Sequence, residues 1–176
     1  YPLFSTFFRE LGMEVVLPDT IDAQGIRRVR TSFCYPVELA HGALQNLIAK
    51  RPDFLFLPSI TELHIEQEGI PKREHQCTCV LLQSEPYYLR SAFREISSGI
   101  TVLSPVINFS RGYHSQMDVF RDVARACGKT DGAARNAYRR AVECHHSVKA
   151  TMKARGKTLL ADLEHDPGRF AIALMG

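Results

Sequence analysis

Apolar residues in the first third of the chain follow two alternating patterns. Residues 3–11 place phenylalanine and leucine on one side of a helix, and a glycine follows them. Residues 13–17 form a short run of β-favouring residues that ends at a proline. Residues 36–50 have helical spacing with proline in the first turn, and residues 53–57 form another apolar run before a proline. These patterns predict helix, buried strand, helix and buried strand in that order.

The alternation continues as far as residue 109. The apolar run at 78–82 predicts a third strand, residues 86–96 predict a helix, and residues 101–109 predict a strand interrupted by proline. Strands without a polar face are typical of parallel sheets that helices cover on both sides. The sequence therefore predicts an α/β fold, a Rossmann- or flavodoxin-like parallel sheet flanked by helices, with a long C-terminal helical segment.

The last third changes to long helical patterns. Residues 115–126 predict a helix that a glycine ends. Thr130 or Asp131 is expected to cap a longer helix running to about Lys157, which Gly156 interrupts or ends. After a turn at Asp-Pro-Gly, the apolar residues 170–175 predict a strand.

This strand would open a further βα unit, so we expect the chain to be a fragment of a larger protein. Three parts are predicted: an α/β domain over 1–110, a helical segment over 111–165, and the first strand of a following lobe over 166–176.

Composition narrows the classes of partner. Charged residues interrupt every apolar run, which excludes a membrane span, and the first ten residues do not resemble a signal peptide. The net charge of +3 and the lack of aromatic residues among the basic ones argue against a nucleic-acid partner. Five cysteines, an odd number without a disulfide spacing, indicate reduced thiols and a cytoplasmic protein.

Motifs for nucleotides and for nucleophilic catalysis are missing. Two Gly-Lys-Thr triplets, at 128–130 and 156–158, match the end of a phosphate-binding loop. The glycine required five residues earlier is replaced by Val123 and Thr151. The sequence therefore predicts no ATP site and contains no complete catalytic set.

The cysteines carry the most specific chemistry. Cys34 precedes the helix at 36–50, where the helix dipole lowers a thiol pKa and favours metal binding. Cys77 and Cys79 form Cys-Thr-Cys, and on a strand both would point to one face. His75, just before them, would point the same way, and Cys34 would supply the fourth ligand of a zinc site. The alternative is that these cysteines are packing residues, as we expect for Cys127 and Cys144.

Several segments together resemble one known family. They are YPLFSTFFRELGMEVVLP (1–18), CYPVELAHG (34–42), DFLFLPS (53–59), Cys-x-x-x-Gln-Ser-x-Pro (79–86) and RFAIALMG (169–176). In this order they resemble the uncharacterised domain attached to, or encoded beside, the ATP-dependent activators of 2-hydroxyacyl-CoA (2-hydroxyglutaryl-CoA) dehydratases. That domain is similar to the dehydratase subunits themselves.

The resemblance implies a [4Fe-4S] cluster bound by cysteines at the tips of Rossmann-like strands. Cys34 and Cys79 fall on the cysteine positions of the family. The family has proline after its second cysteine, and Val80 stands there in this chain, so either Cys79 or Cys77 is the second ligand. Ser59 and Gln83 would donate hydrogen bonds to the cluster sulfides, with ordinary loop capping as the alternative.

The resemblance also implies partners. These are the ATP-dependent activator module, which injects one electron, and the dehydratase subunits, with a CoA thioester bound through a further lobe. The function expected is an iron–sulfur module that receives the electron or docks the activator. The alternatives are an interaction domain without a cluster and a small zinc-stabilised domain.

Overall fold

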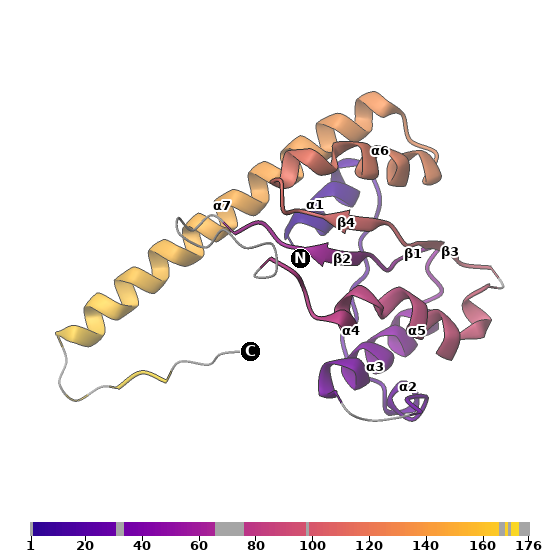
Figure 1. Ribbon diagram of the computed structural model, residues 1–176, viewed down its shortest axis with the longest axis horizontal. Coiled ribbons are helices and arrows are strands. Elements are labelled where there is room, and N and C mark those ends of the chain that lie inside the picture. The colour runs from indigo at the N-terminus through magenta and orange to yellow at the C-terminus, as the bar shows by residue number, and fades with distance from the viewer. Residues whose placement is uncertain are drawn as a thin grey trace.

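The computed structural model describes residues 2–30, 34–65, 76–97, 99–165, 168 and 170–172 (Figure 1). Its helices are α1 (Pro2–Glu10), α2 (Ala23–Ile26), α3 (Tyr35–Ala49), α4 (Val80–Gln83), α5 (Glu85–Ala92), α6 (Met117–Ala126) and α7 (Asp131–Glu164). The 3-10 turns η2 (Arg94–Ser97) and η3 (Tyr113–Gln116) precede β3 and α6. No helix in these ranges is long and apolar enough to cross a membrane.

Four short strands form two parallel two-stranded sheets that follow one another along the same two segments, and we call them together the ribbon. Strand β1 (Phe54–Phe56) pairs in parallel with β3 (Thr101–Leu103), and β2 (Ser59–Glu62) pairs in parallel with β4 (Val106–Asn108). Both pairs have an offset of 47 residues, from 54 to 101 and from 59 to 106.

A proline interrupts each of the two chain segments of the ribbon, and the two prolines lie opposite each other. Pro58 separates β1 from β2, and Pro105 separates β3 from β4. Because proline has no N–H to donate, the regular ladder stops there. Pairing nevertheless continues, since Leu57 N donates to Leu103 O and Ser59 N donates to Pro105 O, each over 2.9 Å.

Helices cover both faces of the ribbon, which explains its apolar sequence. Phe54 and Phe56 pack against a core formed with α1, α6 and α7, whereas Leu55 and Leu57 belong to a second core with α3 and α5. Successive strand residues point to opposite faces, so an unbroken apolar run serves both cores. We call these the first face and the second face.

Helix α7 is buried in its first half and projects from the domain in its second half (Figure 1). Thr130 caps it by accepting a hydrogen bond from Ala133 N. The predicted interruption at Gly156 is wrong, because the helix runs on to Glu164. A glycine inside a helix costs only about 1 kcal/mol, which good helix formers on both sides offset.

Most predicted elements are confirmed. The helices expected at 3–11, 36–50, 86–96 and 115–126 correspond to α1, α3, α5 with η2, and η3 with α6. The strand at 53–57 is β1, and the strand at 101–109 is β3 and β4 around Pro105. Strand β2 has no counterpart among the predicted elements.

Two predicted strands are wrong. Residues 13–17 form no strand: Met13 and Val15 pack against the first core, but Val16 and Leu17 are 42% and 44% exposed. Residues 80–83 form helix α4 instead of part of a strand at 78–82. A short apolar run fits either structure, and here the backbone bond from Gln83 N to Cys79 O closes a helical turn.

The predicted strand at 170–175 lies partly outside the described residues. Within them, residues 170–172 have no regular structure, and Phe170 and Ile172 are exposed. The described part of the chain thus has a mixed α/β fold with a two-stranded parallel ribbon and a long C-terminal helix. The broader Rossmann- or flavodoxin-like sheet is not shown.

Candidate functional site

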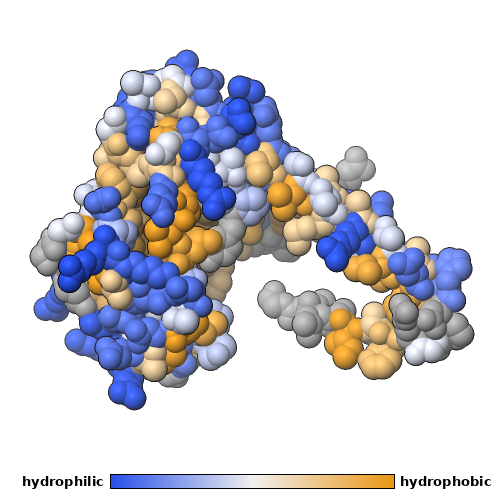
Figure 2. All heavy atoms as spheres, turned by 180° about the vertical axis from the view of Figure 1, so that it is seen from behind, coloured by the Kyte–Doolittle hydropathy of each residue, from blue (hydrophilic) through white to orange (hydrophobic). Residues whose placement is uncertain are grey.

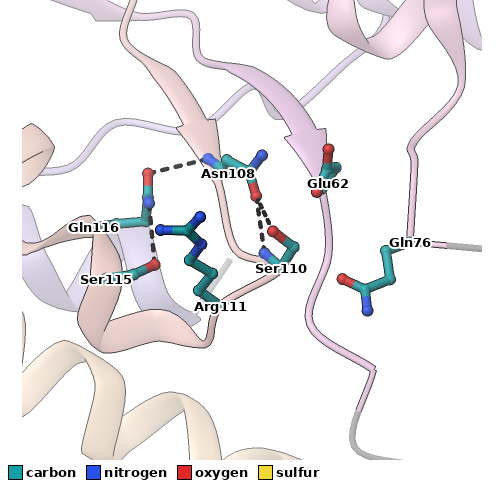
Figure 3. Close-up of a pocket in the computed structure, with 7 residues that line it drawn as sticks. All are labelled: Glu62, Gln76, Asn108, Ser110, Arg111, Ser115 and Gln116. Atoms are coloured by element: carbon teal, nitrogen blue, oxygen red, sulfur yellow. Dashed lines mark hydrogen bonds between the residues drawn. The ribbon is translucent and has the colours of Figure 1, made fainter. Parts of the chain in front are cut away.

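A polar pocket lies where β2 and β4 end together. In α/β sheets, ligands bind outside the carboxyl ends of the strands. This pocket has a volume of about 590 Å³ and is lined by Glu62, Gln76, Asn108, Ser110, Arg111, Ser115 and Gln116 (Figure 3). Its position and its polar walls make it a candidate binding site.

Hydrogen bonds fix the side chains on the β4 side of the pocket. Asn108 Oδ1 accepts hydrogen bonds from Ser110 N (2.9 Å) and Ser110 Oγ (2.6 Å). Gln116 Oε1 accepts one from Asn108 N at 3.0 Å, and Gln116 Nε2 donates to Ser115 Oγ at 3.1 Å. Asn108 therefore closes the loop after β4, and Gln116 ties η3 to the end of that strand.

Two of the predicted metal ligands occupy equivalent places in the fold. Cys34 is the N-cap residue of α3, and Cys79 is the N-cap residue of α4. Neither side chain makes a capping hydrogen bond. Cys34 is half-buried, whereas Cys79 is exposed.

Helix α5, which carries Tyr88, contacts both α3 and α4. Burial raises the pKa of the Tyr88 hydroxyl, and the Glu85 carboxylate and the thiolates of Cys34 and Cys79 raise it further. Charges act on a pKa in this way only at short range, because solvent screens them. Negative charge on either thiol thus disfavours ionisation of the same hydroxyl group.

Cys77 lies closer to the polar pocket. It forms an isolated antiparallel bridge with Glu62, and Leu63 N donates to Gln76 O over 2.8 Å. Its side chain is exposed. Within the described ranges, no group of three His, Cys, Asp or Glu side chains is arranged to hold a metal ion.

Ser59 and Gln83 fasten α4 to the ribbon. The buried Ser59 Oγ donates to Gln83 O at 2.7 Å. Gln83 Nε2 donates to Thr78 O at 2.9 Å. Both side chains hold the segment that carries Cys79, and the role predicted for them at cluster sulfides stays a prediction.

The remaining cysteines lie away from this region. Cys127 follows α6, is half-buried and packs against the first core, and burial raises the pKa of its thiol. Cys144 is half-buried on α7. The packing against the first core agrees with the role expected for Cys127.

Sequence reasoning missed Tyr88 and the whole polar pocket. A signal for part of the pocket was present, because Asn108, Ser110 and Arg111 come at the end of an apolar run, where sheet-edge sites collect polar residues. Tyr88 lies inside an ordinary helical pattern, and its stacking on His41 of α3 comes from the packing of α5.

A match to a known protein family covers the whole chain. The model of the family described as the CoA enzyme activase uncharacterised domain matches residues 1–176, which is the whole chain. The chain belongs to this family. Its membership confirms the resemblance found in the sequence and places the chain among activase-associated domains. No curated protein and no solved structure matches the chain.

Proposed function

We propose that this CoA enzyme activase domain is an iron–sulfur module that receives an electron from the ATP-dependent activator or docks it. The observation that carries the proposal is that Cys34 and Cys79 are the N-cap residues of α3 and α4, two helices that contact α5, and that both thiolates raise the pKa of Tyr88 on α5. Family membership supplies the context of activator and dehydratase subunits.

The chemistry of the donor set fits iron. Thiolates are the usual protein ligands of [4Fe-4S] clusters. Cys34 and Cys79 would hold the cluster, with Cys77 as the nearest further thiol along the chain. A bound cluster supplies one-electron transfer. Ser59 and Gln83 position the Cys79 segment, and a CoA thioester would be bound with a further lobe.

Anaerobic reconstitution with iron and sulfide tests the proposal. The wild type is expected to take up both and to develop a broad visible absorbance, which Cys34→Ser and Cys79→Ser each abolish. Cys144→Ser is the matched control, because this cysteine is also half-buried but lies on α7. A folded wild type without bound iron and sulfide, or equal loss in the control, would contradict the proposal.

A docking domain without a cluster is the second candidate. The observation that favours it is the apolar surface on the projecting half of α7, where Met152, Leu159 and Leu160 are 69%, 59% and 59% exposed (Figure 2). The same assays separate the candidates, because a docking domain binds neither iron nor sulfide. A zinc-stabilised domain would bind zinc stoichiometrically without sulfide.

A further inference from the structure

We infer that the pocket at the ends of β2 and β4 binds a small organic oxyanion that also carries a hydroxyl group. The inference concerns a site separate from the thiols and does not depend on a cluster. It rests on which hydrogen-bonding groups of the pocket are already used and which are left for a ligand.

The internal hydrogen bonds use acceptors and leave donors. Asn108 Oδ1 accepts two hydrogen bonds and Gln116 Oε1 accepts one, so the amide oxygens face their own loop. The hydroxyl protons of Ser110 and Ser115 are donated to Asn108 Oδ1 and Gly112 O. An amide NH2 has two donors, and Gln116 uses one of them on Ser115. The Asn108 amide and the second N–H of the Gln116 amide thus remain for a ligand rich in acceptors.

Arg111 adds positive charge to this donor set. Its side chain extends from the loop after β4 with the guanidinium turned toward Asn108 and Gln116 (Figure 3). Within the described part of the chain, no carboxylate forms an ion pair with it. A guanidinium with five donors in a planar fork matches the oxygens of a carboxylate or a phosphate.

Glu62 gives the pocket a second preference, for a ligand group that donates a hydrogen bond. Its side chain is only 5% exposed and lines the wall contributed by β2. A carboxylate offers about four acceptor positions, so Glu62 accepts a hydrogen bond from a ligand hydroxyl in addition to its other interactions. A second anionic group placed there would be repelled. The pocket volume of about 590 Å³ lies in the usual range for small organic ligands and exceeds the needs of a single inorganic ion.

Three matched probes test this inference by isothermal titration calorimetry: glycerol 3-phosphate, glycerate and neutral glycerol. We expect saturable binding of at least one anion, which tells whether phosphate or carboxylate fits, and no binding of glycerol. Arg111→Gln should weaken the binding at least tenfold, because it removes the guanidinium. Arg90→Gln, which changes an exposed arginine on α5, should leave it unchanged.

A second variant keeps the test decisive if Arg111→Gln does not fold. Gln116→Glu keeps an oxygen that accepts from Asn108 N but replaces the NH2 group by a negative oxygen, so it should abolish anion binding in a folded protein. Binding should persist in Cys34→Ser and Cys79→Ser, which separates this site from the cluster. Absence of saturable binding by both anions, equal binding of glycerol, or unchanged binding in Arg111→Gln would overturn the inference.

Discussion

The two faces of the ribbon differ in what their cores contain. On the first face, aromatic rings pack on one another: Phe120 lies 4.2 Å from Tyr138 and 4.9 Å from Phe7 between ring centroids. On the second face, a smaller core is built from Leu44, Leu55, Leu57, Leu89, Phe93 and Ile96. The first face supports the ribbon through large buried rings, and the second face has less apolar volume to hold its helices.

The second face also carries more polar chemistry. His41 is buried in α3, its Nδ1 lies 2.7 Å from Val37 O, and its ring stacks on Tyr88 at 5.4 Å. Cys34 and Cys79 precede α3 and α4, which both contact α5, and the charges of the two thiolates raise the pKa of the Tyr88 hydroxyl. Large buried rings are concentrated on the first face and candidate reactive groups on the second, so substitutions on the two faces should have separable effects.

The largest effect is expected from the centre of the first face. Phe120 is fully buried and contacts the rings of Phe4, Phe7 and Tyr138. Phe120→Ala removes these contacts and leaves a cavity, so we expect the free energy of unfolding to fall by about 3–5 kcal/mol in urea denaturation. A loss below about 1 kcal/mol would show that the first face is not the main source of stability.

A smaller loss is expected on the second face. Leu89 of α5 is 1% exposed, and Leu89→Ala should lower the free energy of unfolding by about 2–4 kcal/mol. Helix α5 carries Tyr88 and contacts α3, so Leu89→Ala should also change the rate at which the Cys34 thiol reacts with a labelling reagent. Phe120→Ala should leave this rate unchanged in the folded protein. Thiol labelling under native conditions measures this second effect, and equal labelling in the two variants would remove the distinction between the faces.

The next effect compares one tyrosine hydroxyl on each face, that of Tyr138 and that of Tyr88. Tyr138 Oη donates to Tyr113 O at 2.6 Å in the buried interior of the first face. Tyr138→Phe leaves this carbonyl without its donor, and we expect a loss of about 1–2 kcal/mol in the free energy of unfolding. Tyr88 makes no hydrogen bond through its hydroxyl within the described residues, so Tyr88→Phe is the matched control and should change the stability by less than about 0.5 kcal/mol.

The sequence predicted the helices and the central strands because their signals are local. The residues between Asp53 and Pro58 are all apolar, which predicts a buried element, and the short length of the run favours a strand. The run at 78–82 carries the same kind of signal. Here Thr78 Oγ1 donates to Ile60 O of β2 and Gln83 Nε2 donates to Thr78 O, and these bonds accompany a helix at 80–83.

The candidate sites were harder to predict because their residues are far apart in the chain. Cys34 and Cys79 were identified from their motifs, but Tyr88 joins them only through the packing of α5 on α3. Glu62 and Asn108 meet only because β2 and β4 pair in parallel, with Glu62 opposite Asn108 after a register shift. No periodicity in the sequence contains the register of two strands separated by more than 40 residues.

The smallest expected effect is the loss of stability at alkaline pH, which compares the titration of Tyr138 on the first face with that of Tyr88 on the second. The pKa of Tyr138 is raised mainly by burial, and that of Tyr88 by burial and then by Glu85 and the two thiolates. In the unfolded chain both hydroxyls titrate near the ordinary value of 10.0. The folded state therefore holds these protons more tightly, and this contribution to stability is complete below pH 10 and is lost as the pH rises beyond it.

Urea denaturation at a series of pH values from 8 upward should show this decline, and Tyr138→Phe and Tyr88→Phe should each make it less steep. Replacing both Cys34 and Cys79 by serine removes two negative charges beside Tyr88, so its pKa should fall while that of Tyr138 stays the same. Tyrosinate absorbance in the single Tyr→Phe backgrounds measures the two groups separately. If the double serine variant shifts neither tyrosine, the thiols do not share the surroundings of Tyr88, and the second face loses the feature on which the iron–sulfur proposal depends.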